Sequence, residues 1–499
     1  MEQIASNLTI ENRRNNFINR KMIFNVLGLL LCIEAGMFLI CAGVSLYHNE
    51  QDAIFFLYSI LINAGAASLF LLFGRGANRQ LGRRDGYIIV SASWLLFSVF
   101  GMLPFLFSKS IDGVPNAFFE TMSGFTTTGA TILDDIESLS HGMLFWRSLT
   151  QWIGGLGIVL FTIAILPIFG VGNMQLVSAE STGVKHDKIH PKIGMMAKVL
   201  WGVYLVLTIT EVILLYCGGM SMFDAICHSF TTTATGGYST KQDSIAHWNS
   251  PYIEYVVAIF MLLSSINFSL YFMCVKKRSL RILKDDEVKW FLSVVFAVTI
   301  IITASLMVTD QMNLEKAFRL AFFQVVTCQT SCGFATADYM LWPPFTWTLL
   351  LFVMTAGGCT GSTCGGVKSM RVMIMARNIQ NSMKRLLHPN AVIPVRVNGQ
   401  VISSSLVSGV TTFFAVYIAI VLVGWVLLMT VGVDFMEAIS VVISSLGNVG
   451  PALGIYGPAY SWNALPDAAK WIASFLMLIG RLEIYAVLLM CFPDFWRKQ

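Results

Sequence analysis

The chain has 499 residues, of which 56% are hydrophobic and only 12% are charged, and its formal net charge is +5. A soluble core does not use that much apolar surface. The composition therefore excludes an ordinary soluble enzyme or regulator and is typical of a polytopic membrane protein.

Apolar stretches that approach the length of a bilayer crossing recur along the whole chain. A helix needs ~20 mostly apolar residues to cross a hydrocarbon core of ~30 Å. About ten stretches qualify on this criterion, and they are 22–46, 53–74, 87–107, 143–168, 199–219, 252–275, 290–309, 346–367, 401–431 and 468–492. The first is too long for a signal peptide and lacks a small-residue cleavage site, so we expect the polar N-terminal tail to stay attached.

The distribution of Lys and Arg predicts the orientation, because these residues favour cytoplasmic loops. If the N-terminus is cytoplasmic, all but seven of the 33 Lys and Arg residues fall in cytoplasmic segments. Those segments are the N-terminal tail, 75–84, 185–198, 276–289, 368–396 and the C-terminal Arg497 and Lys498. The seven others are Lys109, Arg147, Lys241, Lys316, Arg319, Lys470 and Arg481. We therefore expect both termini to be cytoplasmic, and the isoelectric point of 8.6 reflects this topology rather than a nucleic-acid partner.

After two leading spans in residues 1–86, a unit of span, short outer segment and span occurs four times. The four units cover 87–198, 199–289, 290–400 and 401–499. Their outer segments read "AFFETMSGFTTTGAT", "AICHSFTTTATGGYST", "AFFQVVTCQTSCGFAT" and "AISVVISSLGNVGPA". Each segment begins with an alanine and carries a glycine twelve residues later, in the pairs Ala117/Gly129, Ala225/Gly237, Ala321/Gly333 and Ala438/Gly450. This internal repetition predicts four equivalent structural units.

The stretch between each alanine and its glycine is too short to cross a membrane but long enough for a half-helix. A half-helix followed by a glycine-bearing strand leaves backbone groups unpaired, and these are tolerated only inside protein or beside water. We therefore expect the four strands to line one central pore, as in a potassium channel, where carbonyl oxygens replace the hydration shell of the cation. The negative C-terminal ends of the half-helices also favour a cation. The predicted fold is all-α and polytopic, with four repeats of span, pore helix and span.

These segments resemble a known family. "SGFTTTGATI", "TTATGGYST", "TSCGFAT" and "LGNVGPALG", together with "GGCTGSTCGGVK" and "GRLEIY", are similar to the TrkH/KtrB/HKT superfamily of potassium transporters. The two leading spans are most similar to its TrkH branch. The resemblance implies a multi-pass protein of the bacterial inner membrane, in contact with lipid, that transports potassium and needs no organic cofactor. It further implies a homodimer docked on cytosolic nucleotide-binding subunits of the TrkA type, with the basic segments 276–289 and 368–396 as docking surfaces. The alternative is that the charge of these segments only reflects the topology.

The resemblance also implies which residues form the potassium filter. The predicted filter consists of Thr126, Thr127, Thr128 and Gly129; Ala234, Thr235, Gly236 and Gly237; Thr330, Ser331, Cys332 and Gly333; and Gly447, Asn448, Val449 and Gly450. In the second repeat either Gly236 or Gly237 fits the glycine position, and Gly237 is preferred because Tyr238 then matches Phe334. Sodium-selective plant relatives carry serine where this chain has Gly129. Potassium is therefore favoured, and a sodium-permeable or poorly selective cation channel of the same fold is the alternative.

A run of small and polar residues, which we call the glycine-rich loop, occupies 355–366 of the eighth span. Its glycines are expected to break the helix near mid-membrane. The resemblance implies an intramembrane gate under the filter, formed by Gly357, Gly358, Thr360, Gly361, Ser362, Thr363, Gly365, Gly366 and, at its cytoplasmic end, Lys368. The alternative is close packing of small residues between helices.

Arg481 is the clearest isolated charge within a predicted span. A cation buried in the membrane costs ~2.5 to 3.5 kcal/mol even on insertion scales, so it usually has a partner or a function. Glu483 lies on a different helical face and is not expected to pair with it. The resemblance implies that Arg481 projects into the pore below the filter as part of the gate, and the alternative is that carbonyls at a helix end satisfy it. Arg147 is expected merely to snorkel to the outer surface.

A membrane enzyme is the alternative from another class. Its chemistry would rest on Cys359, Cys364, His228 or Glu120, with a nucleophile beside a base. His228 and Glu120 occupy equivalent positions of two repeats, so divergence between repeats explains them more simply. The scattered cysteines have no His or carboxylate cluster near them that would complete a metal site, and the sequence has no P-loop for ATP.

Overall fold

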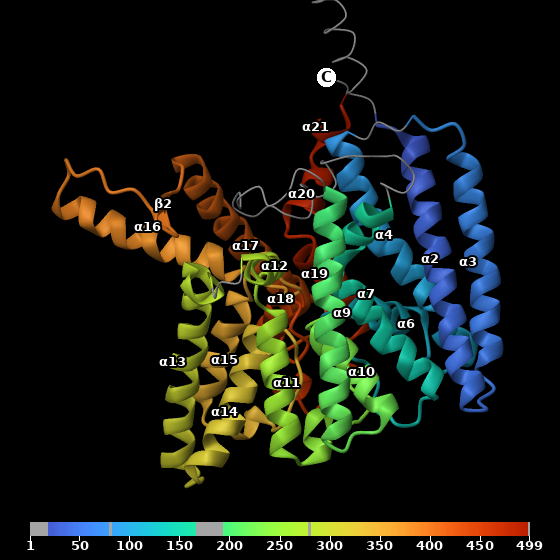
Figure 1. Cartoon of the computed structure of the whole chain (residues 1–499), viewed down its shortest axis with the longest axis horizontal. Helices are drawn as coiled ribbons and strands as arrows, with labels where there is room; N and C mark the ends of the chain where they lie inside the picture. The colour runs from blue at the N-terminus through green and yellow to red at the C-terminus, as the bar shows by residue number, and fades with distance from the viewer. Residues whose placement is uncertain (1–17, 79–81, 166–192, 278–280, 498–499) are drawn as a thin grey trace, which may run out of the picture.

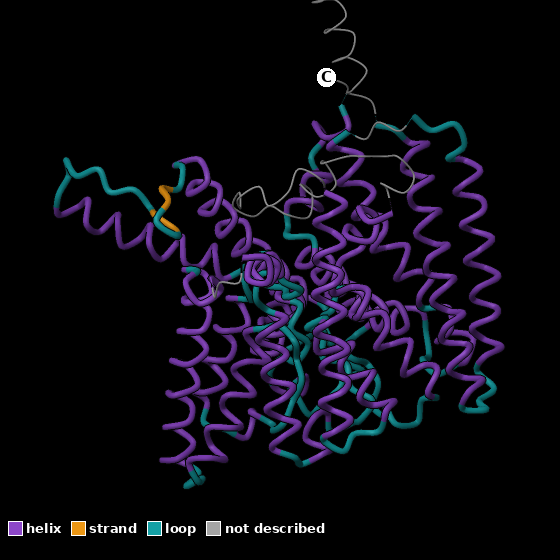
Figure 2. The backbone as a smooth tube through the Cα atoms, viewed as in Figure 1, coloured by secondary structure: helices purple, strands orange, loops and turns teal. Residues whose placement is uncertain are grey.

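The computed structural model describes residues 18–78, 82–165, 193–277 and 281–497. Within these ranges the chain is almost entirely helical (Figures 1 and 2). The strands of the described part are β1 (Arg396–Val397) and β2 (Gln400–Val401), which pair antiparallel. The predicted all-α polytopic class is confirmed.

Six described spans are long and apolar enough to cross a membrane, and one of them is divided between two helices. In chain order they are α2 (Arg20–Tyr47), α3 (Ala53–Phe73), the pair α4 (Arg83–Gly101) and α5 (Leu103–Ser108), α9 (Ile193–Cys217), α13 (Asp286–Thr309) and α17 (Ser404–Thr430). They match the first helix of each predicted repeat and the two leading spans. In Figure 1 the start of α2 and the C-terminus lie at the upper end of the bundle.

The second helix of each predicted repeat is interrupted. These helices are α7 (His141–Ile165), which leaves helical geometry at Gly157; α11 (Pro251–Ser264) followed by α12 (Phe268–Lys277); α15 (Pro344–Ala356); and α19 (Asp467–Arg481) followed at 114° by α20 (Tyr485–Cys491). The expected break in the glycine-rich loop is present, since α15 ends at Ala356. The expectation of unbroken spans over 143–168, 252–275 and 468–492 is wrong. Backbone groups at the breaks in the first two find partners in other repeats, whereas the turn between α19 and α20 is closed by local hydrogen bonds.

Between the two long helices of each predicted repeat lies a short helix that ends inside the protein. These are α6 (Val114–Phe125), α10 (Met222–Thr233), α14 (Leu314–Gln329) and α18 (Phe435–Gly447). Their last two turns are almost completely buried. The half-helices expected from the alanine-to-glycine spacing are therefore present, and each ends just before a predicted filter segment.

The remaining elements are peripheral. They are α16 (Ser369–Leu387), α21 (Pro493–Trp496) and the short 3-10 helices η1 (Ser244–Trp248), η2 (Arg281–Lys284), η3 (Tyr339–Leu341) and η4 (Gly454–Tyr456). Helix α16 and the β1–β2 hairpin extend sideways from the bundle (Figure 1). An ion pair of 3.1 Å between Arg377 and Asp286 ties α16 to the start of α13. Of the predicted cytoplasmic segments, residues 1–17, 79–81, 185–192, 278–280 and 498 lie outside the described residues.

Candidate ion pathway

The backbone of the four predicted filter segments repeats one conformation. The residue ten positions after each starting alanine has a left-handed φ: Thr127 at 52°, Thr235 at 53°, Ser331 at 51° and Asn448 at 51°. Two positions later the glycines also have positive φ: Gly129 at 83°, Gly237 at 78°, Gly333 at 93° and Gly450 at 104°. Glycine adopts this region without steric cost, whereas other residues are strained there. The sequence repeat is therefore also a repeat of backbone geometry.

The four segments approach one another closely enough to form a closed ring. A Cβ atom added to each of the four glycines would lie under 3.0 Å from a carbonyl oxygen of the next repeat. Gly129 faces Gly236 O, Gly237 faces Cys332 O, Gly333 faces Val449 O and Gly450 faces Thr128 O. These oxygens all belong to the residue eleven positions after the starting alanine. The order of contacts runs from the first repeat to the fourth and back to the first, so the four strands surround one axis.

The conformation also distinguishes Gly236 from Gly237. Gly237 has the positive φ of the glycines in the other three segments, whereas Gly236 does not. By geometry Gly237 is thus the equivalent of Gly129, Gly333 and Gly450.

Polar residues on the short helices brace the strands that follow the glycines. Glu120 accepts a hydrogen bond of 3.0 Å from Ile132 N, His228 Nε2 lies 2.9 Å from Ser239 Oγ, and Gln324 Nε2 donates to Ala337 O at 3.0 Å. In the fourth repeat Ser440 Oγ accepts from Leu453 N at 3.1 Å. The first three side chains lie three positions after the starting alanine and Ser440 lies two positions after it. These side chains thus hold the backbone that follows each glycine, a role that mere divergence between repeats does not describe. In the sequence, this role was indicated by polar residues at matching positions of the repeats.

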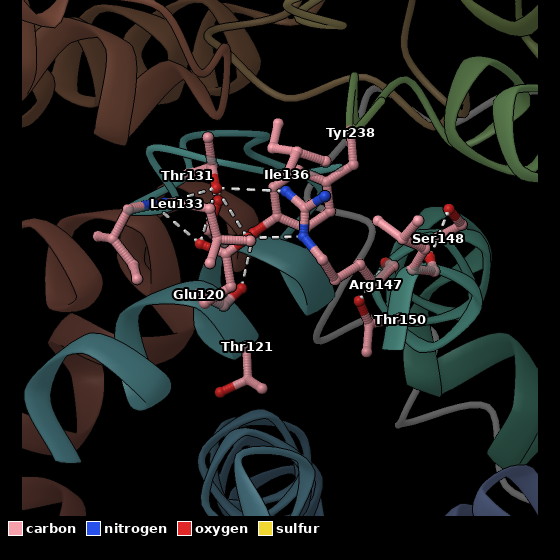
Figure 3. Close-up of polar contacts among 12 residues, drawn as sticks. Glu120, Thr121, Thr131, Leu133, Ile136, Arg147, Ser148, Thr150 and Tyr238 are labelled. Carbon is pink, nitrogen blue, oxygen red and sulfur yellow. Dashed lines mark hydrogen bonds and ion pairs between the residues drawn. The ribbon is translucent and has the colours of Figure 1, made fainter. Parts of the chain in front are cut away.

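Arg147 does not snorkel to the surface; that expectation is wrong. Its side chain is 2% exposed and pairs with the fully buried Glu120 at 2.9 Å (Figure 3). The guanidinium also donates to Thr131 Oγ1 and Ser239 O, both at 3.2 Å, and lies 4.2 Å from the centre of the Tyr238 ring. The ion pair lies within the first repeat, and the same guanidinium joins this repeat to the second through Ser239 O and the Tyr238 ring.

The outer loops of the same two repeats are joined by a weaker pair. Lys241 Nζ lies 3.1 Å from Glu137 Oε2, and both side chains are partly exposed. The hydrogen bond from Lys241 holds the pKa of the Glu137 carboxyl below its ordinary value.

The glycine-rich loop lies against the inner side of the predicted filter. Thr363 Oγ1 accepts a hydrogen bond from Thr235 Oγ1 at 3.3 Å and is 3.1 Å from Thr233 O. Gly365 N donates to Ser331 Oγ at 2.7 Å. A Cβ on Gly365 would lie 2.9 Å from Asn448 Cβ. The loop therefore contacts the predicted filter segments of the second, third and fourth repeats.

Arg481, the last residue of α19, binds this loop. Its guanidinium donates to Thr363 O at 2.7 Å, to Gly155 O at 3.1 Å and to Gly154 O. Backbone carbonyls thus accept its hydrogen bonds, as the alternative interpretation supposed, but they belong to the loop and to α7 just before its break at Gly157. Glu483 makes an ion pair of 2.5 Å with Arg371 of α16.

The groups considered for an enzyme serve other contacts. His228 uses both ring nitrogens, since Nδ1 lies 2.8 Å from Asp224 O and Nε2 contacts Ser239. Cys359 and Cys364 are buried in the loop, and Cys364 Sγ lies 3.0 Å from Ser265 Oγ. All ten cysteines are free. In the described ranges His, Cys, Asp and Glu form no group that could hold a metal ion.

Comparisons with known proteins agree with this geometry. The family model TrkH, described as "Cation transport protein", matches residues 49–498. The Trk system potassium uptake protein TrkH of Escherichia coli is 37% identical over 482 residues, which cover 96% of this chain and 99% of that protein. The Trk system potassium uptake protein TrkG of the same organism is 33% identical over 488 residues, with coverage of 96% and 99%. The crystal structure of the potassium transporter TrkH from Vibrio parahaemolyticus superposes with a TM-score of 0.87 at 34% identity, with coverage of 96% and 99%.

Proposed function

The chain belongs to the TrkH family of cation transport proteins, and we propose from this membership that it takes up potassium through the ring formed by its four glycine-bearing strands. The observation that carries the proposal is the closed ring of carbonyls from Thr128, Gly236, Cys332 and Val449, each within contact range of a glycine in a neighbouring repeat. Ordered carbonyl oxygens around one axis replace the water shell of a dehydrated cation. The relatives are named as potassium uptake proteins, which supports potassium as the ion.

The membrane potential supplies the driving force in this proposal. It is worth ~2.3 kcal/mol per charge per 100 mV across the membrane. The short helices add to the attraction, because α6, α10, α14 and α18 end at the ring and present partly negative C-termini to it. Glycine at all four ring positions keeps side chains away from the neighbouring carbonyls. This pattern resembles potassium-selective members of the superfamily, which favours potassium over the alternative of sodium permeation.

The glycine-rich loop is proposed to close the pathway below the ring. Its contacts with Thr235 and Ser331 support this role, since the loop lies across the exit of the ring. Arg481 adds a positive charge beside Thr363 of the loop. A cation leaving the ring meets both the loop and this charge, so opening requires the loop and Arg481 to move apart.

Regulation is proposed to come from a partner. The relatives are named as parts of a Trk system, which supports a system with more than one component. The partner is proposed to be a cytosolic nucleotide-binding subunit, and the transporter a homodimer in the bacterial inner membrane, as the resemblance to the TrkH branch implies. Helix α16 and the start of α13 form a candidate docking surface, because α16 carries Lys384 and Arg385 and extends away from the bundle (Figure 1). Both termini and α16 would then face the cytoplasm.

Rubidium uptake tests the proposal. Purified protein in proteoliposomes with an imposed inward potential should accumulate rubidium, and external potassium should block this uptake whereas sodium should not. Gly129→Ser should make sodium an effective competitor, because a side chain there would lie against Gly236 O. Equal block of the wild-type protein by sodium would favour the poorly selective alternative. If the wild-type protein is inactive, the assay is repeated with Arg481→Ala. Uptake by this variant would indicate that the gate of the wild-type protein is closed, whereas no uptake would indicate that the proposed transport function is wrong.

A further inference from the structure

One buried side chain of α7 reaches the predicted filter segment of the second repeat. Gln151 is completely buried. Its Nε2 donates to Gly236 O at 2.7 Å and its Oε1 accepts from Tyr238 N at 3.0 Å. A single amide thus binds the backbone on both sides of Gly237, the glycine with positive φ.

The same contact explains why the second repeat has two adjacent glycines. Gly236 has an ordinary φ, so its backbone does not require glycine. A Cβ at this position would lie under 3.0 Å from Cδ, Oε1 and Nε2 of Gln151. The equivalent residues of the other repeats are Thr128, Cys332 and Val449, which all carry side chains. Gly237 is therefore glycine because of its conformation, and Gly236 is glycine because Gln151 occupies the space.

Gln151 makes the four carbonyls of the ring inequivalent. Among the hydrogen bonds of the described residues, Gly236 O is the ring oxygen that accepts from a side chain. Hydrogen bonding to an amide fixes the direction of this carbonyl and withdraws one of its lone pairs from the ion. One turn earlier on α7, Arg147 holds Ser239 O at 3.2 Å. The second repeat is thus braced at two points by a helix of the first.

We propose that Gln151 is a positioning residue for ion specificity: it holds the Gly236 carbonyl at the distance from the axis that suits potassium. A carbonyl released from this bond can move inward and coordinate a smaller ion, so that discrimination against sodium falls. The inference rests on the proposed function, because it assumes that the ring is the path of the ion.

Gln151→Met tests the inference, since methionine keeps the volume and removes both hydrogen bonds. The measurement is a ratio of two concentrations, that of sodium that halves rubidium uptake divided by that of potassium that does so. We expect this ratio to fall roughly three- to tenfold, which corresponds to the loss of one or two hydrogen bonds. The control is Asn63→Leu, which removes an equally buried amide that donates to Glu34 at 3.0 Å between α2 and α3, outside the four repeats. Its ratio should stay that of the wild-type protein.

A double substitution covers the case in which Gln151→Met does not fold. Gly236→Ala should displace the Gln151 amide and lower the ratio as Gln151→Met does, and with Gln151→Ala in the same chain the ratio should equal that of Gln151→Ala alone. Two results would overturn the inference while leaving potassium uptake established. One is that the effects of Gly236→Ala and Gln151→Ala add in the double variant, and the other is that Gln151→Met has the ratio of the wild-type protein. Wild-type vesicles without potassium-selective uptake would instead overturn the proposed function and the inference with it.

Discussion

Breaking the Arg147–Glu120 ion pair should destabilise the protein by about 3 kcal/mol, at the lower end of the range for buried pairs. The two side chains are 2% and 0% exposed and lie 2.9 Å apart, so Arg147→Met leaves a carboxylate that water does not reach. The estimate lies at the lower end because Glu120 keeps its bonds from Thr131 Oγ1 and Ile132 N, both at 3.0 Å. The free energy of unfolding, measured by SDS titration in mixed micelles, reports the loss.

A double-substitution cycle separates pairing from packing. Replacing both partners, as Arg147→Met with Glu120→Leu, should recover part of the loss, because no unpaired charge is then buried, while Ile132 N and Thr131 Oγ1 lose their acceptor. Arg497→Met is the matched exposed control, since its pair with Asp494 is 74% and 80% exposed and is expected to contribute nothing measurable. If the double variant loses as much as the sum of the single variants, the buried pair is not the source of the effect and the reasoning is refuted.

Three further predictions concern transport. Gly333→Ala should act like Gly129→Ser and make sodium an effective competitor of rubidium uptake, because its Cβ would lie under 3.0 Å from Val449 O at a φ of 93°, whereas Gly409→Ala on the open face of α17 should leave the competition unchanged. Arg481→Ala should raise uptake by protein without its partner, measured as the initial rate in proteoliposomes, because the substitution removes the charge and the bond to Thr363 O. Thr363→Val should raise the same rate to a smaller extent, since it removes the hydroxyl bonds that hold the loop under the ring but leaves Arg481 in place.

The sequence predicts those parts of the fold whose signal is local and repeated. Spans follow from the length of apolar runs, and the half-helices follow from the distance between Ala117 and Gly129 and its three counterparts. Positive φ at the glycines is implied by the residue type, since glycine alone adopts it without strain. These features need no knowledge of what the segment contacts.

The breaks in α7 and between α11 and α12 were not predicted, because their free backbone groups are satisfied by distant residues. Cys359 N donates to Ser265 O at 2.9 Å, and Phe268 N donates to Gly361 O at 3.2 Å, so the gap between α11 and α12 is filled by the glycine-rich loop of the next repeat. A helix interrupted in the membrane requires such partners. For α7 the residues "GGLG" at 154–157 carried a signal, whereas "SSIN" at 264–267 did not.

The roles of Arg147 and Gln151 were missed for a related reason. Both lie on α7 and act on Tyr238 and its neighbours in the second repeat. Gln151 and Tyr238 are 87 residues apart in the chain, and no repeating pattern in the sequence links the two positions. A single sequence can show that two polar side chains lie in an apolar span, but the partner depends on how the repeats pack.

The position of the glycine-rich loop has an energetic consequence for the proposed gate. If an irregular loop faced lipid, its backbone groups would have no new hydrogen-bond partner when the loop moved. A loop that faces an aqueous pathway can instead replace its protein partners with water. The bonds from Gly365 N to Ser331 Oγ and from Arg481 to Thr363 O face such a pathway in our proposal. Each bond then contributes only about 0.5–1.5 kcal/mol to closure, or about 1.5–3 kcal/mol where a charge takes part. A regulator that binds the open form more tightly by a few kcal/mol would therefore suffice to open the gate, so an irregular loop suits a gate better than an unbroken helix.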